Sequence, residues 1–187
     1  MSISTLLLGL KIALIAATGV EQIELEGPKN CLEEAGAIVS IVSAEEGKIR
    51  CWDCGTLQPR DEFIVNVPLK DASAEDFDAL VIPGGMFIDD IRLAENAIPF
   101  ISGFKDKPIA SICHGQQLLI DPGFVKDKTL TSYPGIKIDI ENAGGYWVNE
   151  EVVRDGLLLT GRGRSDTEAF DKALIEFLKE YHEAHPK

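Results

Sequence analysis

Residues 108–119 read PIASICHGQQLL and join an apolar, strand-like run to a helix-like run. Cys113 ends the first run, and His114 follows it at once. SICHG has the small-x-nucleophile-x-small form of a nucleophile elbow, with Ser111 in place of the first Gly. Such a turn exposes the nucleophile at a helix N-terminus, where free N–H groups favour a thiolate and can bind an oxyanion. The pattern predicts a reactive Cys113, against the alternative of a small buried hydrophobe.

Short apolar runs alternate with amphipathic stretches from one end of the chain to the other. Runs rich in Val, Ile, Leu and Ala are typical of strands buried on both faces, and they fall at 11–17, 38–43, 79–85, 108–113 and 157–162. Helical patterns lie at about 21–36, 89–104, 114–121 and 166–183. This alternation predicts an α/β fold, a parallel sheet with helices on both faces. The turn residues and alternating runs in the interval from Gly47 predict a β-hairpin excursion. We expect residues 1–187 to form a single domain, with residues 1–10 as an N-terminal arm.

Composition excludes several classes of partner. The 187 residues carry a net charge of −13 with no basic cluster, so we expect neither nucleic-acid binding nor binding to anionic membranes. The apolar N-terminus has no Lys or Arg before it, and Lys11 interrupts it. It therefore predicts neither a signal peptide nor a membrane span. We expect a cytoplasmic protein whose four cysteines are reduced.

The chemistry should gather at the carboxyl ends of the strands, where ligands bind in open α/β sheets. His114 is nearly the only imidazole available to Cys113, because the other two histidines lie in the last six residues. Neighbours in sequence need not have side chains that meet, so adjacency alone predicts no Cys-His ion pair. Glu21, Asp89 or Asp90 could orient the imidazole. A protonated carboxyl beside the thiol would support a thiolate, whereas an ionised one would oppose it.

Four segments together resemble the ThiJ/PfpI superfamily, most closely its PfpI-like intracellular protease and deglycase branch. They are VEQIEL at 20–25, FDALVIPGG at 77–85, ASICHGQQL at 110–118 and TSYPGIKIDIENAG at 131–144. The resemblance runs from about residue 11 to about residue 181. It implies a flavodoxin-like three-layer sandwich and a homo-oligomer, at least a dimer, in which a neighbouring subunit completes each site.

The resemblance also implies roles for individual residues. Cys113 matches the nucleophile, His114 its companion and Glu21 the acid that contacts the thiol. Asp89 matches the acid that the neighbouring subunit supplies. Backbone N–H groups of the PGG segment and the elbow, with Tyr133 nearby, form the oxyanion and substrate site: Gly84, Gly85, His114 and Gly115.

This chain departs from the family pattern at three places. Gln116 stands where the family usually has Pro after Cys-His-Gly. GRGRSD replaces SRxPxD near the last strand, so Gly163 and Arg164 are expected to reshape the pocket rim. Asp89 is one methylene shorter than the usual Glu, which shortens its reach to His114.

The CWDC motif at 51–54 allows three interpretations. It could be a structural turn, a reversible disulfide, or half of a zinc site completed by His182 and His185. Dinucleotide and Walker A loops are absent from the sequence, and we expect neither a metal nor a cofactor.

The first functional hypothesis is therefore a cofactor-free enzyme in which Cys113 attacks an activated carbonyl, as in a glyoxalase or deglycase. Its substrate would be a small carbonyl compound, a glycated amine or a peptide, so a cysteine peptidase or amidase is an alternative. A second hypothesis is an oxidative-stress redox sensor or chaperone that uses the same cysteine. A third is a catalytically silent scaffold.

Overall fold

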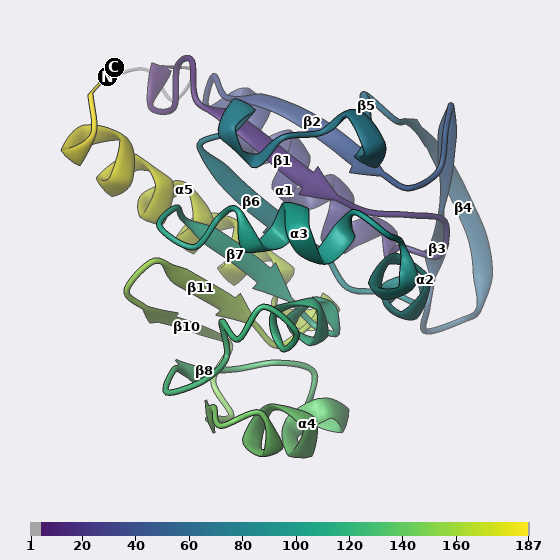
Figure 1. The fold of residues 1–187 in the computed structure, drawn as a ribbon, viewed down its shortest axis with the longest axis vertical. Coiled ribbons are helices and arrows are strands. Elements are labelled where there is room, and N and C mark those ends of the chain that lie inside the picture. Colours follow the sequence, from purple (N-terminus) through teal and green to yellow (C-terminus); the bar gives the residue numbers. More distant parts are fainter. Residues whose placement is uncertain (1–4, 187) are drawn as a thin grey trace.

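The computed structural model describes residues 5–186, and its centre is a seven-stranded sheet (Figure 1). Six strands are parallel, and only the edge strand β10 runs antiparallel to its neighbour. In spatial order they are β10 (Val152–Asp155), β11 (Leu158–Gly161), β7 (Ile109–Ile112), β6 (Ala79–Ile82), β1 (Lys11–Ile15), β2 (Ile38–Ser43) and β5 (Val67–Pro68). The α/β fold class and its parallel sheet are confirmed.

Helices cover both faces of this sheet. Helices α1 (Gln22–Glu34) and α5 (Thr167–Ala184) pack against each other on one face. Helices α2 (Ile88–Leu93) and α3 (Ala97–Ser102) lie on the opposite face (Figure 1). Helix α4 (Lys137–Asn142) packs beside a small sheet of β8 (Thr129–Leu130) and β9 (Tyr146–Trp147). Short 3-10 helices are η2 (Leu69–Asp71), η3 (Ala74–Asp76), η4 (Gly115–Leu119), η5 (Pro134–Ile136) and η6 (Arg164–Asp166).

Each expected strand is present, although most end earlier than the apolar runs do. Two helical segments differ from expectation. The stretch 89–104 forms two short helices, and 114–121 contains a five-residue 3-10 helix in place of a longer α-helix. Of the expected arm, residues 1–4 lie outside the described part, while Leu7 and Leu10 are buried in the core.

Buried strand centres explain why the strand sequences are so apolar. All four residues of β6, β7 and β11 are buried, as the middle of a sheet covered on both faces requires.

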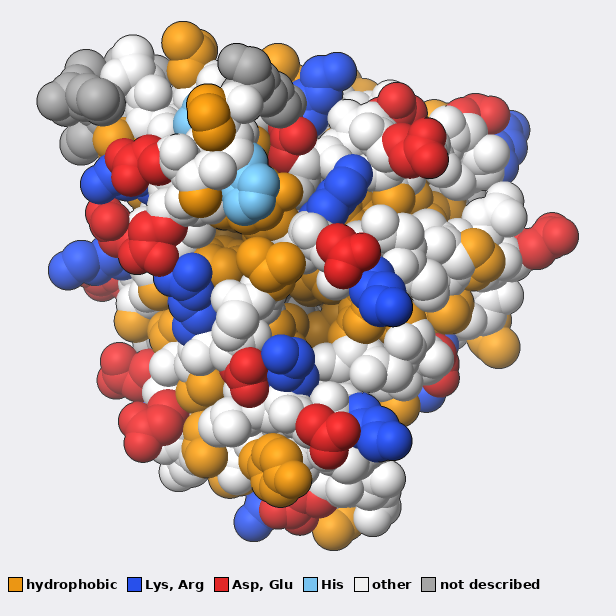
Figure 2. Space-filling view, turned by 60° about the vertical axis from the view of Figure 1, so that its left-hand side comes forward, with side chains coloured by type: hydrophobic (Ala, Val, Ile, Leu, Met, Phe, Trp, Pro, Cys, Tyr) orange, Lys and Arg blue, Asp and Glu red, His pale blue; other side chains and the backbone are white. Residues whose placement is uncertain are grey.

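The charged surface shows no basic patch on the face drawn in Figure 2, where Lys and Arg side chains are scattered among acidic ones. Within residues 5–186, no helix has both the length and the apolar character of a membrane span.

The expected hairpin consists of β3 (Lys48–Asp53) and β4 (Gln58–Ile64), paired antiparallel. Its first strand is fastened to the segment that precedes α1, because the Trp52 N–H donates to Val20 O at 2.8 Å and the Gly19 N–H donates to Arg50 O at 2.9 Å. These bonds bring the hairpin turn to the carboxyl ends of the central strands.

Asp171 makes fold stability depend on pH. It lies on α5 against Gly27 of α1, and its Oδ1 is buried without a hydrogen-bond partner in the described chain. Burial raises its pKa from 3.8 to about 7. A carboxyl with a raised folded-state pKa stabilises the fold at pH values below its unfolded pKa, and this contribution is lost as pH rises through the folded pKa.

We predict that Asp171→Asn removes this dependence. Between pH 4 and pH 7 the wild type should lose stability relative to the variant, by roughly 1 kcal/mol because the side chain is only partly buried. Urea unfolding of both proteins at several pH values measures the difference. Parallel stability curves for the two proteins would contradict the prediction.

Candidate functional site

A cavity of about 510 Å³ opens at the carboxyl ends of the strands. It receives side chains from the elbow after β7, the first turns of α1 and α2, the hairpin turn and the loop after β11. The residues with reactive or polar groups in its lining are Glu21, Glu24, Cys54, Asp89, Cys113, His114, Gln117, Tyr133 and Arg164. Residues that follow the strand ends, where the sequence analysis expected the chemistry, therefore line one cavity.

Cys113 occupies the strained turn of a nucleophile elbow. Its φ of +66° lies in the left-handed region, which non-glycine residues rarely adopt outside functional turns. The turn also needs small neighbours: a Cβ on Gly115 would lie 2.6 Å from Ile82 O and 2.7 Å from Ser111 Oγ. Hydrogen bonds hold both sides of the turn, with the Cys113 N–H donating to Gly161 O and the Tyr133 N–H donating to Cys113 O.

Gln116 braces this elbow from beneath. Its side chain is fully buried, and its Nε2 lies 2.9–3.2 Å from Ser111 O, Thr131 O and Gly161 O, so that its two N–H groups are shared among three carbonyl acceptors. These carbonyls belong to segments on three sides of the turn. The residue that replaces the family's usual Pro is therefore a hydrogen-bonded support for Cys113, which sequence reasoning missed.

Glu24, and not Glu21, is the carboxyl beside the thiol, so the predicted position of this acid is wrong. Glu24 is buried, its carboxyl is close enough to the Cys113 thiol to raise the pKa of the thiol, and its Oε2 accepts the Gly84 N–H at 2.8 Å. Glu21 has an extended backbone just before α1, and its Oε2 accepts the Cys54 N–H at 2.8 Å. A helical signal was available: Glu24 shares the buried face of α1 with Pro28 and Leu32 at four-residue spacing.

Burial makes Glu24 and Cys113 compete for one proton. It raises the pKa of Glu24 to about 7, although the hydrogen bonds to the thiol and to Gly84 oppose the rise. The pKa of Cys113 is raised by burial and then by the charge of Glu24. An ionised Glu24 thus keeps the thiol protonated, whereas a protonated Glu24 can donate to a thiolate.

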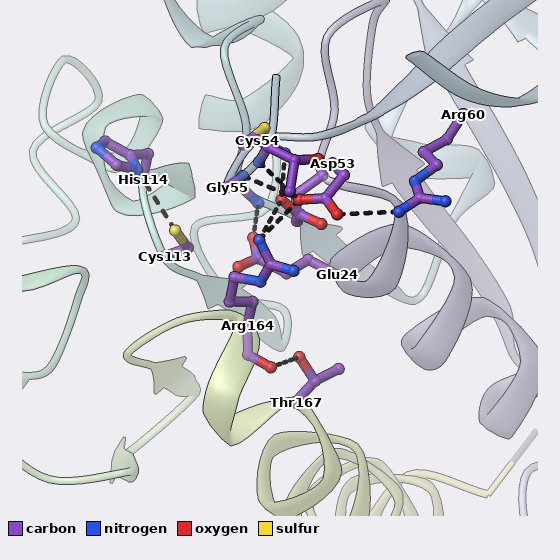
Figure 3. A network of polar contacts seen from close by, with 12 residues as sticks. Glu24, Asp53, Cys54, Gly55, Arg60, Cys113, His114, Arg164 and Thr167 are labelled. Atoms are coloured by element: carbon purple, nitrogen blue, oxygen red, sulfur yellow. Dashed lines mark hydrogen bonds and ion pairs between the residues drawn. The ribbon is translucent and has the colours of Figure 1, made fainter. Parts of the chain in front are cut away.

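His114 contacts the thiol directly, a point that adjacency in sequence left open. Its Nδ1 lies 3.3 Å from Cys113 Sγ (Figure 3). Its ring stacks on Tyr133 with 4.6 Å between centroids and 25° between planes. Burial lowers the pKa of His114, so the imidazole is neutral at neutral pH and can accept a proton. Tyr133 itself lines the cavity, and its ring packs against one face of the imidazole.

The three predicted glycines have different positions. The Gly84 N–H is occupied by Glu24, and a Cβ on Gly84 would lie 2.5 Å from Glu24 Oε2 and 2.6 Å from Cys113 Cβ. Gly85 lines the cavity with φ +136°, and its N–H makes no hydrogen bond within the described chain. Gly115 is buried under the turn, outside the lining. Gly85 and His114 therefore remain as candidate oxyanion donors.

Asp89 lies apart from Cys113 and His114. It is an exposed residue of the first turn of α2 at the cavity rim. Within one chain it makes no hydrogen bond or ion pair to His114 among residues 5–186.

The CWDC cysteines face in different directions. Cys51 is buried in the core, whereas Cys54 lines the cavity, and neither forms a disulfide in the structure. Burial raises the pKa of both thiols to about 12. His182 lies near the end of α5 and His185 just beyond it, and no group of three metal-ligating side chains occurs in the part of the chain that the structure describes.

Comparison with known proteins identifies the family. Residues 10–177 match the model of the DJ-1/PfpI family, and the chain belongs to that family. It is 38% identical over 174 residues to Deglycase PH1704 of Pyrococcus horikoshii, covering 91% of this chain and 100% of the relative. General stress protein 18 of Bacillus subtilis is 34% identical over 175 residues, which cover 92% of this chain and 99% of the relative.

A solved structure agrees with the fold. The two-domain protein of Anabaena variabilis with DJ-1/ThiJ/PfpI-like and ferritin-like domains superimposes with a TM-score of 0.83 at 32% identity. The match covers 90% of this chain and 48% of that one, so this chain corresponds to about half of the two-domain protein. The flavodoxin-like fold expected from the resemblance is confirmed.

We predict that Glu24→Gln lowers the pKa of Cys113 by about 1, because it removes the negative charge beside the thiol and keeps a hydrogen-bond donor. The rate of iodoacetamide alkylation at Cys113, followed by mass spectrometry across pH, measures this pKa. Glu21→Gln is the matched control and should leave the profile close to that of the wild type. A larger shift in Glu21→Gln than in Glu24→Gln would refute the assignment.

Proposed function

We propose that this member of the DJ-1/PfpI family is a cysteine-dependent, cofactor-free deglycase or glyoxalase that acts on small carbonyl compounds and their amine adducts. One observation carries the proposal: Cys113 is held in a strained elbow at the floor of a cavity, with the Glu24 carboxyl and the His114 imidazole both against its sulfur. The deglycase names of relatives more than 35% identical along nearly the whole chain support the same reaction class.

The geometry supports attack by Cys113 on an aldehyde carbon. His114 takes the thiol proton, while protonated Glu24 stabilises the developing thiolate by a hydrogen bond. Addition to methylglyoxal gives a hemithioacetal whose oxyanion is stabilised by the N–H groups of Gly85 and His114, until the imidazole returns the proton.

The remaining steps need only proton transfers and water. A proton moves from C1 to C2 of the hemithioacetal through His114, which yields a lactoyl thioester, and water then releases lactate and the free thiol. On a hemiaminal adduct, Cys113 displaces the amine and forms the same hemithioacetal, so a glycated amine enters the same sequence. Tyr133 keeps the imidazole in the plane that both transfers require.

We further propose that Asp89 acts across a subunit interface. Its place at the exposed rim, with no hydrogen bond or ion pair in its own chain among residues 5–186, leaves its carboxyl available to the His114 of another copy. Exposed apolar residues near the same rim, Met86 and Leu93, supply surface that a second subunit would cover.

A redox function of the same cysteine is the second candidate. The buried Glu24 carboxyl beside Cys113 could stabilise an oxidised sulfur, and a relative carries the name general stress protein. A redox function requires oxidation of Cys113, whereas the proposed enzyme requires turnover of a substrate.

We predict that the protein converts methylglyoxal to lactate without added cofactor and that Cys113→Ser reduces this activity to the uncatalysed rate. Chromatography of lactate, beside loss of the aldehyde, measures turnover. Cys54→Ser, which removes the other thiol of the cavity, is the control and should keep most of the activity. Persistence of the aldehyde with the wild type would reject this substrate and favour an amide substrate or the redox function.

We also predict that two inactive variants complement each other. Asp89→Asn and Cys113→Ser should each be nearly inactive alone. If each site combines Cys113 of one chain with Asp89 of another, co-refolding equal amounts should restore about a quarter of the wild-type activity, because random dimers place one intact site in each heterodimer. Absence of recovery in mixed dimers isolated by two affinity tags would show that Asp89 does not act between subunits.

A further inference from the structure

Arg164 is the one cationic side chain that lines the cavity among the described residues. The other charged residues of the lining are acidic: Glu21, Glu24 and Asp89. Arg164 begins η6, three residues after the end of β11, and its guanidinium points toward the hairpin turn at Asp53 and Gly55 (Figure 3).

Asp53 fixes the position of that guanidinium. Arg164 Nη1 donates to Asp53 Oδ1 at 2.9 Å and lies 4.0 Å from Glu21 Oε2. Asp53 is itself oriented, because its Oδ1 accepts the N–H groups of Gly55 and Thr56 at 3.0–3.1 Å and its Oδ2 accepts from Arg60 at 3.0 Å. Arg60 and then Arg164 hold the pKa of Asp53 well below its usual range, so this anchor stays ionised.

Gly55 leaves room for the guanidinium beside the hairpin turn. A Cβ on Gly55 would overlap Arg164 Nη1, so only a residue without a side chain leaves room at this turn. A Cβ on Gly163 would lie 3.6 Å from Cys113 Sγ and 3.8 Å from Glu24 Oε1. The segment that carries Arg164 therefore runs beside Cys113 and Glu24, and all three residues line the same cavity.

Half of the guanidinium has no protein partner. Among residues 5–186, only its Nη1 takes part in a hydrogen bond or ion pair, which leaves Nε and Nη2 unpaired on a side chain that is 49% exposed. Nε and Nη2 form one fork of a guanidinium, the arrangement that binds the two oxygens of a carboxylate in parallel. The cation is thus anchored on one edge and open on the other.

We propose that Arg164 is a specificity residue that binds a carboxylate of the substrate, so that the site favours carbonyl adducts of free amino acids over those of neutral amines. The inference rests on the proposed function for its reaction and on the Arg164 geometry for its ligand. The other ionisable side chains of this lining that can carry a full charge are carboxyl groups, so the binding of an anionic substrate depends on this one cation.

Alkylation of Cys113 tests the binding step without turnover. Iodoacetate and iodoacetamide displace iodide at the same sulfur, and they differ in that only iodoacetate carries a carboxylate. The ratio of their rates cancels any change in the thiolate fraction. We expect Arg164→Gln to lower the ratio of iodoacetate to iodoacetamide rates about tenfold and Arg164→Lys to lower it less, since lysine keeps the charge and loses the fork.

Arg60→Gln is the matched control, because it removes the other cation on Asp53 and lies outside the cavity lining. Its ratio should stay near the wild-type value. An unchanged ratio in Arg164→Gln, or an equal fall in Arg60→Gln, would overturn the proposal and leave Arg164 as a structural link to the hairpin. Peptide mapping identifies the alkylated cysteine, so that each rate is measured for Cys113 alone.

Turnover separates this proposal from the proposed function. The methylglyoxal adducts of N-acetylarginine and of its C-terminal amide differ only in the carboxylate. We expect a lower KM for the acid in the wild type and similar KM values for both adducts in Arg164→Gln, with kcat nearly unchanged. If neither adduct is turned over but the alkylation ratio depends on Arg164, the proposed deglycase reaction is rejected and the proposed carboxylate-binding role of Arg164 is kept. If the wild type turns over both adducts with equal KM, the carboxylate-binding role of Arg164 is rejected and the proposed deglycase reaction is kept.

Discussion

The whole site depends on the absence of a side chain at Gly84. Three segments meet there: the loop after β6, the first turn of α1 and the elbow after β7. A single Cβ would lie 2.5 Å from the Glu24 carboxylate and 2.6 Å from Cys113 Cβ. Glu24 is buried and Cys113 is half-buried, and both are hydrogen-bonded to backbone, so a shift of either would disturb the ends of the strands. Contact between thiol and carboxyl is therefore set by the close packing of backbone, more than by attraction between the two groups.

The pKa values of Glu24 and Asp53 are shifted in opposite directions because the surroundings of the two carboxyl groups differ. Glu24 is enclosed, is opposite a thiol and accepts one N–H group, so its pKa rises to about 7. Asp53 accepts two N–H groups and faces two guanidinium groups, so its pKa falls. One can give and take a proton near neutral pH, whereas the other remains an anion. An acidic cavity can therefore contain a carboxyl that changes its protonation near neutral pH and, beside it, an arginine held by an ionised aspartate.

The sequence could predict what depends on local pattern. The buried strands, the elbow at Cys113 and the hairpin follow from apolar runs, small residues and turn residues, and the structure contains them. Glu24 was missed because Glu21 and Glu24 are three residues apart, and the choice between them depends on where α1 begins. Helical spacing from Pro28 and Leu32 would have favoured Glu24, but only once the helix start at Gln22 was known.

Contacts between distant segments lay beyond any pattern in the chain. Arg164 meets Asp53 across 111 positions of sequence, and Gln116 bonds Gly161 across 45. The elbow after β7 instead follows directly from a short stretch. This difference separates two parts of the site: the Cys113–His114 contact arises from neighbours in sequence, while the contact of Arg164 with the hairpin turn arises from segments that only the fold brings together. Changes at the turn or the loop can therefore alter what the thiol attacks and leave the thiol and its imidazole in place.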